Sequence, residues 1–190
     1  TSMQNKLNDN IQMSVGTSLS SCGWTLDSAG TTYTLANDLT ATGTCLTIGA
    51  NNVTVDMAGY NITKEGVGGS NGIDNPGDYN YTSVKNGGIY NFQMGIWNDY
   101  GDYGNFTNLT IIGNLNIVMS SAYGIYLRGD NNLVDTLNSS ITNIGGAGSS
   151  YGIMINSGSN NNVTNSFFSG TTFDVVVANS VDTNIFLNST

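Results

Sequence analysis

A short unit recurs along this chain, and its recurrence limits the possible folds more than any other feature of the sequence. Segment 123–134, YGIYLRGDNNLV, returns as segment 151–163, YGIMINSGSNNNV, and segment 45–55, CLTIGANNVTV, follows the same plan. Each unit has an apolar pair, a glycine-containing turn, an Asn pair and a second strand-like run. Recurrence of this kind indicates stacked units that share one core. Gly-Ile dipeptides begin at Gly72, Gly88, Gly95, Gly124 and Gly152.

Apolar and polar residues alternate within the units, as they do in half-buried β-strands. Val53, Val55 and Met57 alternate with Thr54 and Asp56, and no mid-chain window keeps helical spacing for three turns. Glycine and asparagine at the turns accept left-handed backbone angles. Asn at equivalent places in successive coils can stack as a hydrogen-bonded ladder. The pattern predicts an all-β chain of parallel coils.

An antiparallel sandwich is the competing β fold, and it would favour tight Asn-Gly hairpins between long strands. Two Asn-Gly pairs exist, beginning at Asn71 and Asn86, but they do not recur with the repeat. Parallel coils therefore fit the sequence better.

The composition separates this chain from several protein classes. Charged residues make up 9%, against roughly a quarter in ordinary soluble domains. Disorder is an alternative for so polar a chain, but 38% hydrophobic residues in short alternating runs favour an ordered β protein. The net charge of −9 argues against nucleic acid as a partner. No apolar stretch approaches the roughly 18 residues of a membrane span.

The first coils carry a family resemblance. Segments 21–26 (SCGWTL), 33–39 (YTLANDL), 43–48 (GTCLTI) and 52–63 (NVTVDMAGYNIT) resemble the start of secreted and cell-surface parallel β-helix repeat proteins. These pectate-lyase-like solenoids are common on microbial, and especially archaeal, surfaces. The resemblance covers roughly residues 21–187 and implies a single-stranded right-handed parallel β-helix. It says little about function, because this solenoid carries many functions.

The resemblance and the repeat together divide the chain. Residues 1–20 are expected to form an N-terminal arm or short capping helix, because Met3, Leu7, Ile11 and Val15 recur every fourth residue. This segment would cover the first coil or reach onto a neighbouring subunit. Residues 21–190 are expected to form the β-helix, with an aromatic and acidic insertion at about 74–103.

The two cysteines, Cys22 and Cys45, each lie beside a strand-like run. If those runs occupy adjacent coils, about 4.8 Å apart, a disulfide can form without backbone strain. Two independent buried thiols are the alternative. A zinc site is not expected, because the chain has no histidine.

Asn-x-Ser/Thr sequons are frequent, although a chain rich in Asn, Ser and Thr produces them by chance. They mark glycan acceptors only in an exported protein. The opening of the chain shows no secretory signal, so the protein is either cytosolic or has lost its signal. The sequons and the cysteine pair together predict an extracellular or cell-surface location. The main candidates are Asn61, Asn80, Asn105, Asn108 and Asn138, and further sequons begin at Asn52, Asn162 and Asn188.

The segment 74–103 is the most distinctive local region, because aromatic and acidic residues gather there. Its aromatic side chains could stack on sugar rings, form the core of an interface, or pack as a loop on the side of the solenoid. Its aspartates are weak calcium candidates, since they offer hard oxygen ligands on glycine-containing turns. The interface or sugar-stacking candidates are Tyr79, Tyr81, Trp97, Tyr100 and Tyr103, and the calcium candidates are Asp74, Asp78, Asp99 and Asp102.

Catalytic residues are not predicted. The pectate-lyase-like enzymes that the chain resembles use a carboxylate-bound calcium with an Arg base, or clustered Asp with a His and a basic pair. This chain has one arginine, Arg128, one glutamate, Glu65, and no histidine. Glycosidases need two facing carboxylates, and no acidic pair recurs at two-residue spacing. We therefore expect a protein that is not an enzyme and has no cofactor other than possible calcium. The Arg-Gly-Asp tripeptide at Arg128 is interpreted as a chance match on a repeat turn.

The strand pattern continues through residues 183–190, and an uncovered coil there would expose unpaired backbone groups that invite edge pairing. The sequence thus favours a secreted structural subunit that assembles with itself, head to tail, into a filament, sheath or surface layer and carries covalent N-glycans. The alternative is a carbohydrate-binding or polysaccharide-cleaving β-helix module. A repeat from a larger adhesin is a third possibility.

Overall fold

The computed structural model describes residues 17–66, 69–115, 120–144, 148–178 and 183–190. These residues form eighteen β-strands and no helix, and the strands belong to two sheets that we call A and B. Sheet A contains β1 (Thr17–Leu19), β3 (Thr32–Leu35), β4 (Leu39–Ala41), β6 (Thr54–Asp56), β7 (Asn61–Lys64), β9 (Ser83–Tyr90), β11 (Asn105–Leu115), β13 (Leu133–Asn143), β15 (Asn162–Thr164), β16 (Phe167–Gly170) and β18 (Ile185–Leu187). Sheet B contains β2 (Trp24–Leu26), β5 (Leu46–Ile48), β8 (Asn71–Asn75), β10 (Met94–Asp99), β12 (Ala122–Arg128), β14 (Ser150–Ser157) and β17 (Phe173–Val177).

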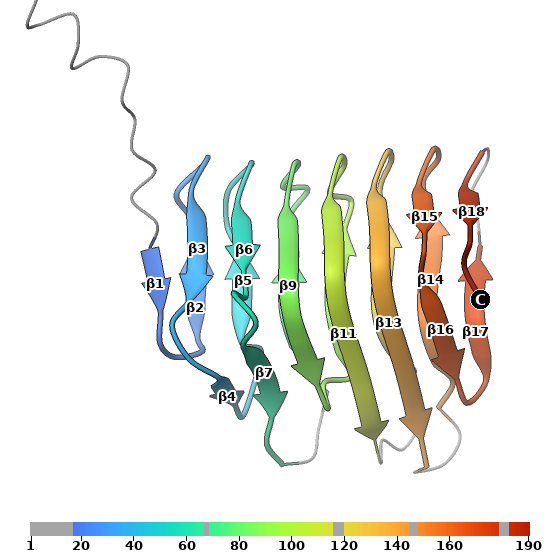
Figure 1. The fold of residues 1–190 in the computed structure, drawn as a ribbon, viewed down its shortest axis with the longest axis horizontal. Coiled ribbons are helices and arrows are strands. Elements are labelled where there is room, and N and C mark those ends of the chain that lie inside the picture. The colour runs from blue at the N-terminus through green and yellow to red at the C-terminus, as the bar shows by residue number, and fades with distance from the viewer. Residues whose placement is uncertain (1–16, 67–68, 116–119, 145–147, 179–182) are drawn as a thin grey trace, which may run out of the picture.

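The chain passes alternately through the two sheets, and we call one passage through B and then A a rung. Figure 1 shows the sheet A strands side by side in chain order, with sheet B behind them. Equivalent residues of successive rungs are register partners: Ile73, Ile96, Ile125 and Ile153 follow one another across sheet B. Every strand pairing among the described residues is parallel, so an antiparallel sandwich is excluded. The predicted all-β parallel class is confirmed, and the arrangement is compatible with a parallel β-solenoid.

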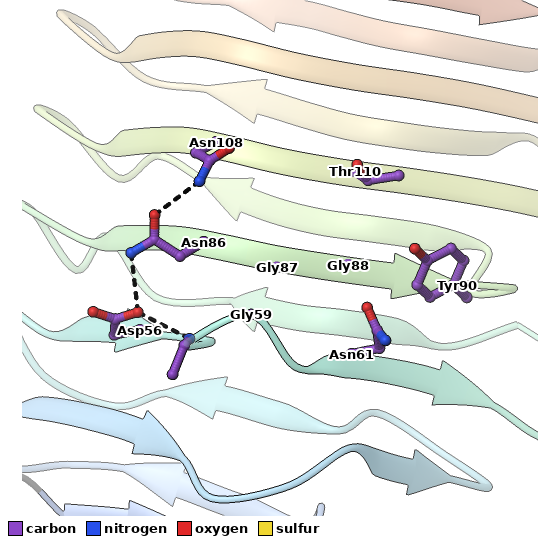
Figure 2. Close-up of a pocket in the computed structure, with 10 residues that line it drawn as sticks. Asp56, Gly59, Asn61, Asn86, Gly87, Gly88, Tyr90, Asn108 and Thr110 are labelled. Atoms are coloured by element: carbon purple, nitrogen blue, oxygen red, sulfur yellow. Dashed lines mark hydrogen bonds between the residues drawn. The ribbon is translucent and has the colours of Figure 1, made fainter.

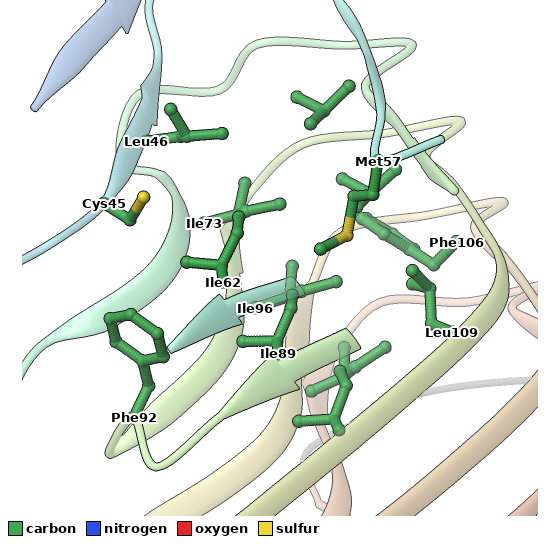
Figure 3. Packing of buried hydrophobic residues seen from close by; sticks show 14 of the residues in the cluster. Cys45, Leu46, Met57, Ile62, Ile73, Ile89, Phe92, Ile96, Phe106 and Leu109 are labelled. Atoms are coloured by element: carbon green, nitrogen blue, oxygen red, sulfur yellow. The ribbon is translucent and has the colours of Figure 1, made fainter. Parts of the chain in front are cut away.

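The core is a continuous apolar layer between the two sheets. Figure 3 shows sheet B residues Leu46, Ile73 and Ile96 packed near Ile62 and Ile89 of sheet A, all of them buried. Each fully buried aliphatic side chain contributes about 1.5–3 kcal/mol of hydrophobic stabilisation. Because successive rungs repeat the same inward positions, each rung buries its apolar face against its neighbours.

The Gly-Ile repeat forms a closely packed column of glycines in sheet B. Gly72, Gly95, Gly124 and Gly152 lie next to the register-paired isoleucines of sheet B. A Cβ on Gly95 would lie 2.6 Å from the carbonyl oxygen of Gly124, and one on Gly124 would lie 2.3 Å from that of Gly152. Only a residue without a side chain fits this column.

The turn from sheet B to sheet A carries two hydrogen-bonded ladders, as the Asn pairs predicted. On the outside, the Oδ1 atoms of Asn51 and Asn80 accept from the backbone N–H groups of Asn80 and Asp102, respectively, both at 2.8 Å. On the inside, Asn161 Oδ1 accepts from the N–H of Asn132 at 2.9 Å. The residue between the two ladders has a positive φ in successive rungs: Asn52, Tyr81, Tyr103, Asn131, Asn160 and Thr183.

The domain boundaries differ from expectation in two places. Strand β1, Thr17–Leu19, pairs with β3 in sheet A, so the sheet begins inside the predicted 1–20 arm. Residues 74–103 contain β9 and β10, which pair in register with both of their neighbours. That segment continues the rungs instead of interrupting them. The helical spacing of Met3, Leu7, Ile11 and Val15 lies outside the described residues.

Candidate functional site

The cysteine prediction is confirmed: Cys22 and Cys45 form a disulfide with a Cα–Cα distance of 4.4 Å. The bond joins the chain just before β2 to the chain just before β5, which are neighbouring strands of sheet B. Closing this loop, with a sequence separation of 23, stabilises the fold by about 3 kcal/mol. The disulfide therefore ties the first two rungs together.

A groove of about 530 Å³ crosses the outer face of sheet A. We call it the amide groove, because Asn61, Asn86 and Asn108 line it. Figure 2 shows a row of hydrogen bonds along one side: Asn108 Nδ2 donates to Asn86 Oδ1 at 3.0 Å, and Asn86 Nδ2 donates to Asp56 Oδ1 at 3.1 Å. The other lining residues are Ala58, Gly59, Gly87, Gly88, Tyr90 and Thr110.

Asp56 is the carboxylate of this groove, and its surroundings favour the charged form. Its Oδ1 also accepts from the N–H of Ala58 at 3.0 Å, and its Oδ2 lies 3.3 Å from Lys85 Nζ. Burial raises the pKa of Asp56, but the hydrogen bonds from Ala58 and Asn86, with the contacts from Lys85, outweigh burial and lower it. No second carboxylate lines the groove, so it lacks the facing acid pair of glycosidases.

Tyr90 provides the aromatic wall of the groove, and sequence reasoning did not select it. A Cβ on Gly88 would lie 2.4 Å from Tyr90 Cε2 and 2.5 Å from Asn61 Oδ1, so the ring lies over the glycine. Figure 2 shows the ring face-on beside Gly88. The sequence does contain a signal for this contact, because Gly88 precedes the outward-facing Tyr90 by two residues on the same strand.

The aromatic candidates of segment 74–103 are separated by the fold. Tyr81 and Tyr103 stack on each other at the turn, with ring centroids 5.0 Å apart. Trp97 lies on sheet B, stacked on Tyr126 at 4.1 Å, whereas Tyr79 packs against the core. Each stacked ring covers one face of its partner, and Tyr81 and Tyr103 nevertheless stay 54% and 49% exposed.

The stacking on sheet B extends well beyond the residues selected from the sequence. Tyr123 stacks on Tyr151 at 5.0 Å, and Tyr151 stacks on Phe173 at 5.7 Å. Burial raises the pKa of both Tyr123 and Tyr126. The Tyr-Gly-Ile repeat gave the signal for Tyr123 and Tyr151, since equivalent residues of adjacent rungs must be neighbours.

Arg128 is held within the molecule. Its Nη1 lies 2.9 Å from Asp99 Oδ1, and its guanidinium lies over the ring of Tyr100, 4.1 Å from the centroid, with an additional hydrogen bond to the hydroxyl. The Arg-Gly-Asp tripeptide thus has its cation engaged by Asp99 and Tyr100.

The calcium candidates fall into two places. Asp74 and Asp99 lie on sheet B, whereas Asp78 and Asp102 line a second cavity of about 380 Å³ at the turn. Within the described ranges, no group of three or more His, Cys, Asp or Glu is placed to hold a metal ion. Calcium binding stays an untested hypothesis.

The sequon asparagines differ in their surroundings. Asn105, Asn108 and Asn138 are exposed on sheet A, whereas Asn61 and Asn80 are partly buried. Asn80 belongs to the outer turn ladder, and the hydroxyl of its sequon partner Thr82 is used within the fold. The sequons thus include both structural and free amides.

Comparisons with models of protein families, with curated proteins and with solved structures found no match. The function is therefore argued from the geometry of the chain itself. No helix in the described ranges is long and apolar enough to cross a membrane.

At each end of sheet B, one residue in an inward position is exposed to solvent. In sheet B, Leu127 and Ile155 are fully buried register partners, but the next partner, Val177 of β17, is 43% exposed. At the other end, Leu46 is buried and its partner Trp24 of β2 is 55% exposed. Within the described ranges, these two columns are therefore buried in the middle and exposed at one end each, while Leu26 in the same strand as Trp24 stays buried.

Proposed function

We propose that the protein is a right-handed parallel β-helix that serves as an extracellular structural subunit, and that copies join head to tail into a filament, sheath or surface layer. The right hand follows from the strong preference of parallel β crossovers for it. The observation that carries the proposal is the pair of uncovered core columns, ending at Val177 and Trp24.

The geometry of the ends favours a head-to-tail contact. In the described residues, β17 and β18 each pair on one side only, and so do β2 and β1. Because all strands within a sheet run parallel, β1 of one copy can pair with β18 of another. The main path of sheet A has one more strand than that of sheet B, so β17 and β2 of the two copies then face each other across one strand position of sheet B. Val175 and Trp24 lie on the two sides of that position, in the column that already contains Ile125 and Ile153.

Pairing at open strand edges supplies backbone hydrogen bonds, and the uncovered side chains supply apolar burial. A contact between two different surfaces propagates as a fibre when the rotation between successive copies does not close a ring. The disulfide next to the β2 end supports both an oxidising, extracellular location and a first rung rigid enough to act as a template.

Assembly is tested by Val177→Lys, with Ile112→Lys as the matched control. Ile112 is an exposed aliphatic residue in mid-sheet β11, far from either end. Sedimentation velocity over a concentration series should show growing assemblies for the wild type and Ile112→Lys. Val177→Lys should weaken association roughly 100-fold, because assembly would bury an unpaired charge. A wild-type protein that stays monomeric at high concentration would contradict the proposal.

A second candidate function, binding of a neutral polysaccharide, is favoured by the amide groove. The ring of Tyr90 over Gly88 offers a flat apolar surface, and Asn61 and Thr110 offer neutral hydrogen-bonding groups. Binding of the wild type to a soluble polysaccharide that is lost in Tyr90→Ala would support this function. If the wild type binds no polysaccharide, this second function is rejected and assembly is the one that remains.

A further inference from the structure

An exposed phenylalanine interrupts the polar outer face of sheet A. Phe167 in β16 is 51% exposed, and its register partner in β13 is Asn138. The preceding residues of the same column are Thr110, Gly88 and Asn61. The exposed ring beside this column offers apolar surface that a covering group would remove from water.

Asn138 begins a sequon, and the strand geometry explains how sequons arise here. Successive side chains of a strand point to opposite faces, so Asn138 and Ser140 share the outer face while the buried Ser139 points inward. The same polar-out, inward, polar-out pattern produces Asn-x-Ser/Thr at other strands of sheet A. A sequon alone therefore does not identify an acceptor in this chain.

Hydrogen bonding distinguishes Asn138 from Asn80 and Asn108. Asn80 Oδ1 is used by the turn ladder, and Asn108 Nδ2 donates to Asn86. Asn138 is exposed and its side chain makes no hydrogen bond within the described part of the chain. Its amide can be modified without breaking a contact of the fold.

We propose that Asn138 is N-glycosylated and that the first sugar of the glycan covers Phe167. The donor is a polyprenyl-diphosphate-linked oligosaccharide. Nδ2 of Asn138 forms a bond to C1 of the sugar, the C1–O bond breaks with its electron pair going to the diphosphate, and one amide proton is released. This inference rests on the extracellular location in the proposed function and is independent of assembly.

The register places sugar and ring together. Neighbouring strands lie about 4.8 Å apart, so a sugar attached to the side chain of Asn138 reaches the ring on the next strand. The C–H face of a pyranose against Phe167 removes apolar surface from water. The matched comparison is Asn105, an exposed sequon residue whose register partners are Ser83 and Leu133 and include no aromatic residue.

The test is glycopeptide mass spectrometry of the chain secreted from a glycosylating host, with an added sequon in a C-terminal tag reporting that the transferase acted. Asn138 should be occupied. Asn138→Gln should lower Tm by about 2 °C, and this loss should disappear in a Phe167→Ala background, whereas Asn105→Gln should show no coupling to Phe167.

An unmodified Asn138 beside an occupied tag overturns the inference. So does an occupied Asn138 whose effect on Tm is the same with and without Phe167. Sedimentation of Asn138→Gln reports assembly separately, so failure of the glycan inference and failure of the proposed function are distinguishable.

Discussion

Tyrosine in the left-handed region is the most unusual residue-scale feature of this chain. Tyr81 and Tyr103 have φ values of 61° and 56°, at turn positions where Asn131 and Asn160 stand in later rungs. Bulky residues pay a steric cost there that Asn avoids. The stacking of the two rings on each other offsets part of that cost, because it buries apolar surface beside the turn.

Two aspartates should give opposite pH effects. Burial, with the nearby charge of Asp99, raises the pKa of Asp74. Hydrogen bonds from Thr164, Asn165 and Thr136 lower that of Asp135. A raised acid pKa means that the folded state binds the proton more tightly, so Asp74 costs stability at neutral pH. Asp135 adds stability above the ordinary carboxyl pKa, and this is lost as the pH falls through its lowered value. Urea unfolding at pH 7 should therefore show Asp74→Asn stabilised and Asp135→Asn destabilised.

Both differences should shrink at pH 3, because protonation removes much of the charge that distinguishes the wild type from each variant. Equal signs for the two variants at pH 7 would contradict the assignment of burial to one aspartate and hydrogen bonding to the other.

At this scale the sequence predicted the turn ladders, because paired Asn residues recur with the repeat. It did not predict that Tyr81 and Tyr103 occupy the same turn position as Asn131 and Asn160. The same turn position holds tyrosine in some rungs and asparagine in others. The aromatic composition of segment 74–103 was therefore interpreted as an insertion, although the segment keeps the repeat. Tyr90 was not selected because only contact with Gly88 distinguishes it from an ordinary surface tyrosine.

Among the elements, the glycine column of sheet B sets the distance between the sheets. A Cβ on Gly124 would lie 1.8 Å from Ser139 Oγ and 2.3 Å from the carbonyl oxygen of Gly152. Since the obstacle includes backbone of the next rung, it cannot be relieved by a side-chain rotation alone. The column therefore links sheet B to the facing strand β13 of sheet A.

Gly124→Ala should destabilise the protein by about 1–3 kcal/mol, as overpacking of a close contact does. The matched control is Gly43→Ala, since a Cβ there has nothing within 4 Å and should change stability by less than about 0.5 kcal/mol. Thermal unfolding followed by circular dichroism measures both. Similar melting temperatures for the two variants would show that the sheets are not held at this distance.

The parallel pairing of the elements was predictable because the Gly-Ile units are spaced by whole rungs and become register partners. The Cys pair was predictable for the same reason. Short strands such as β4 and β16 were not predictable from the repeat, because they depend on how far each rung extends along sheet A before it turns.

For the whole molecule, head-to-tail assembly depends on the exposed residues at the ends of the two sheets. Val177 at one end and Trp24 at the other are inward positions whose register partners in the middle are buried. A head-to-tail contact brings both into one interface, whereas a two-fold contact between identical ends involves only one kind of end.

Mixing two singly blocked variants distinguishes these arrangements and tests the central claim most directly. Trp24→Lys blocks the β2 end and Val177→Lys blocks the β17 end, so each alone should sediment as a monomer. An equimolar mixture should contain one-to-one dimers and nothing larger, because a single free head meets a single free tail. Dimers of either variant alone, or a mixture that stays monomeric under conditions where the wild type assembles, would contradict head-to-tail assembly.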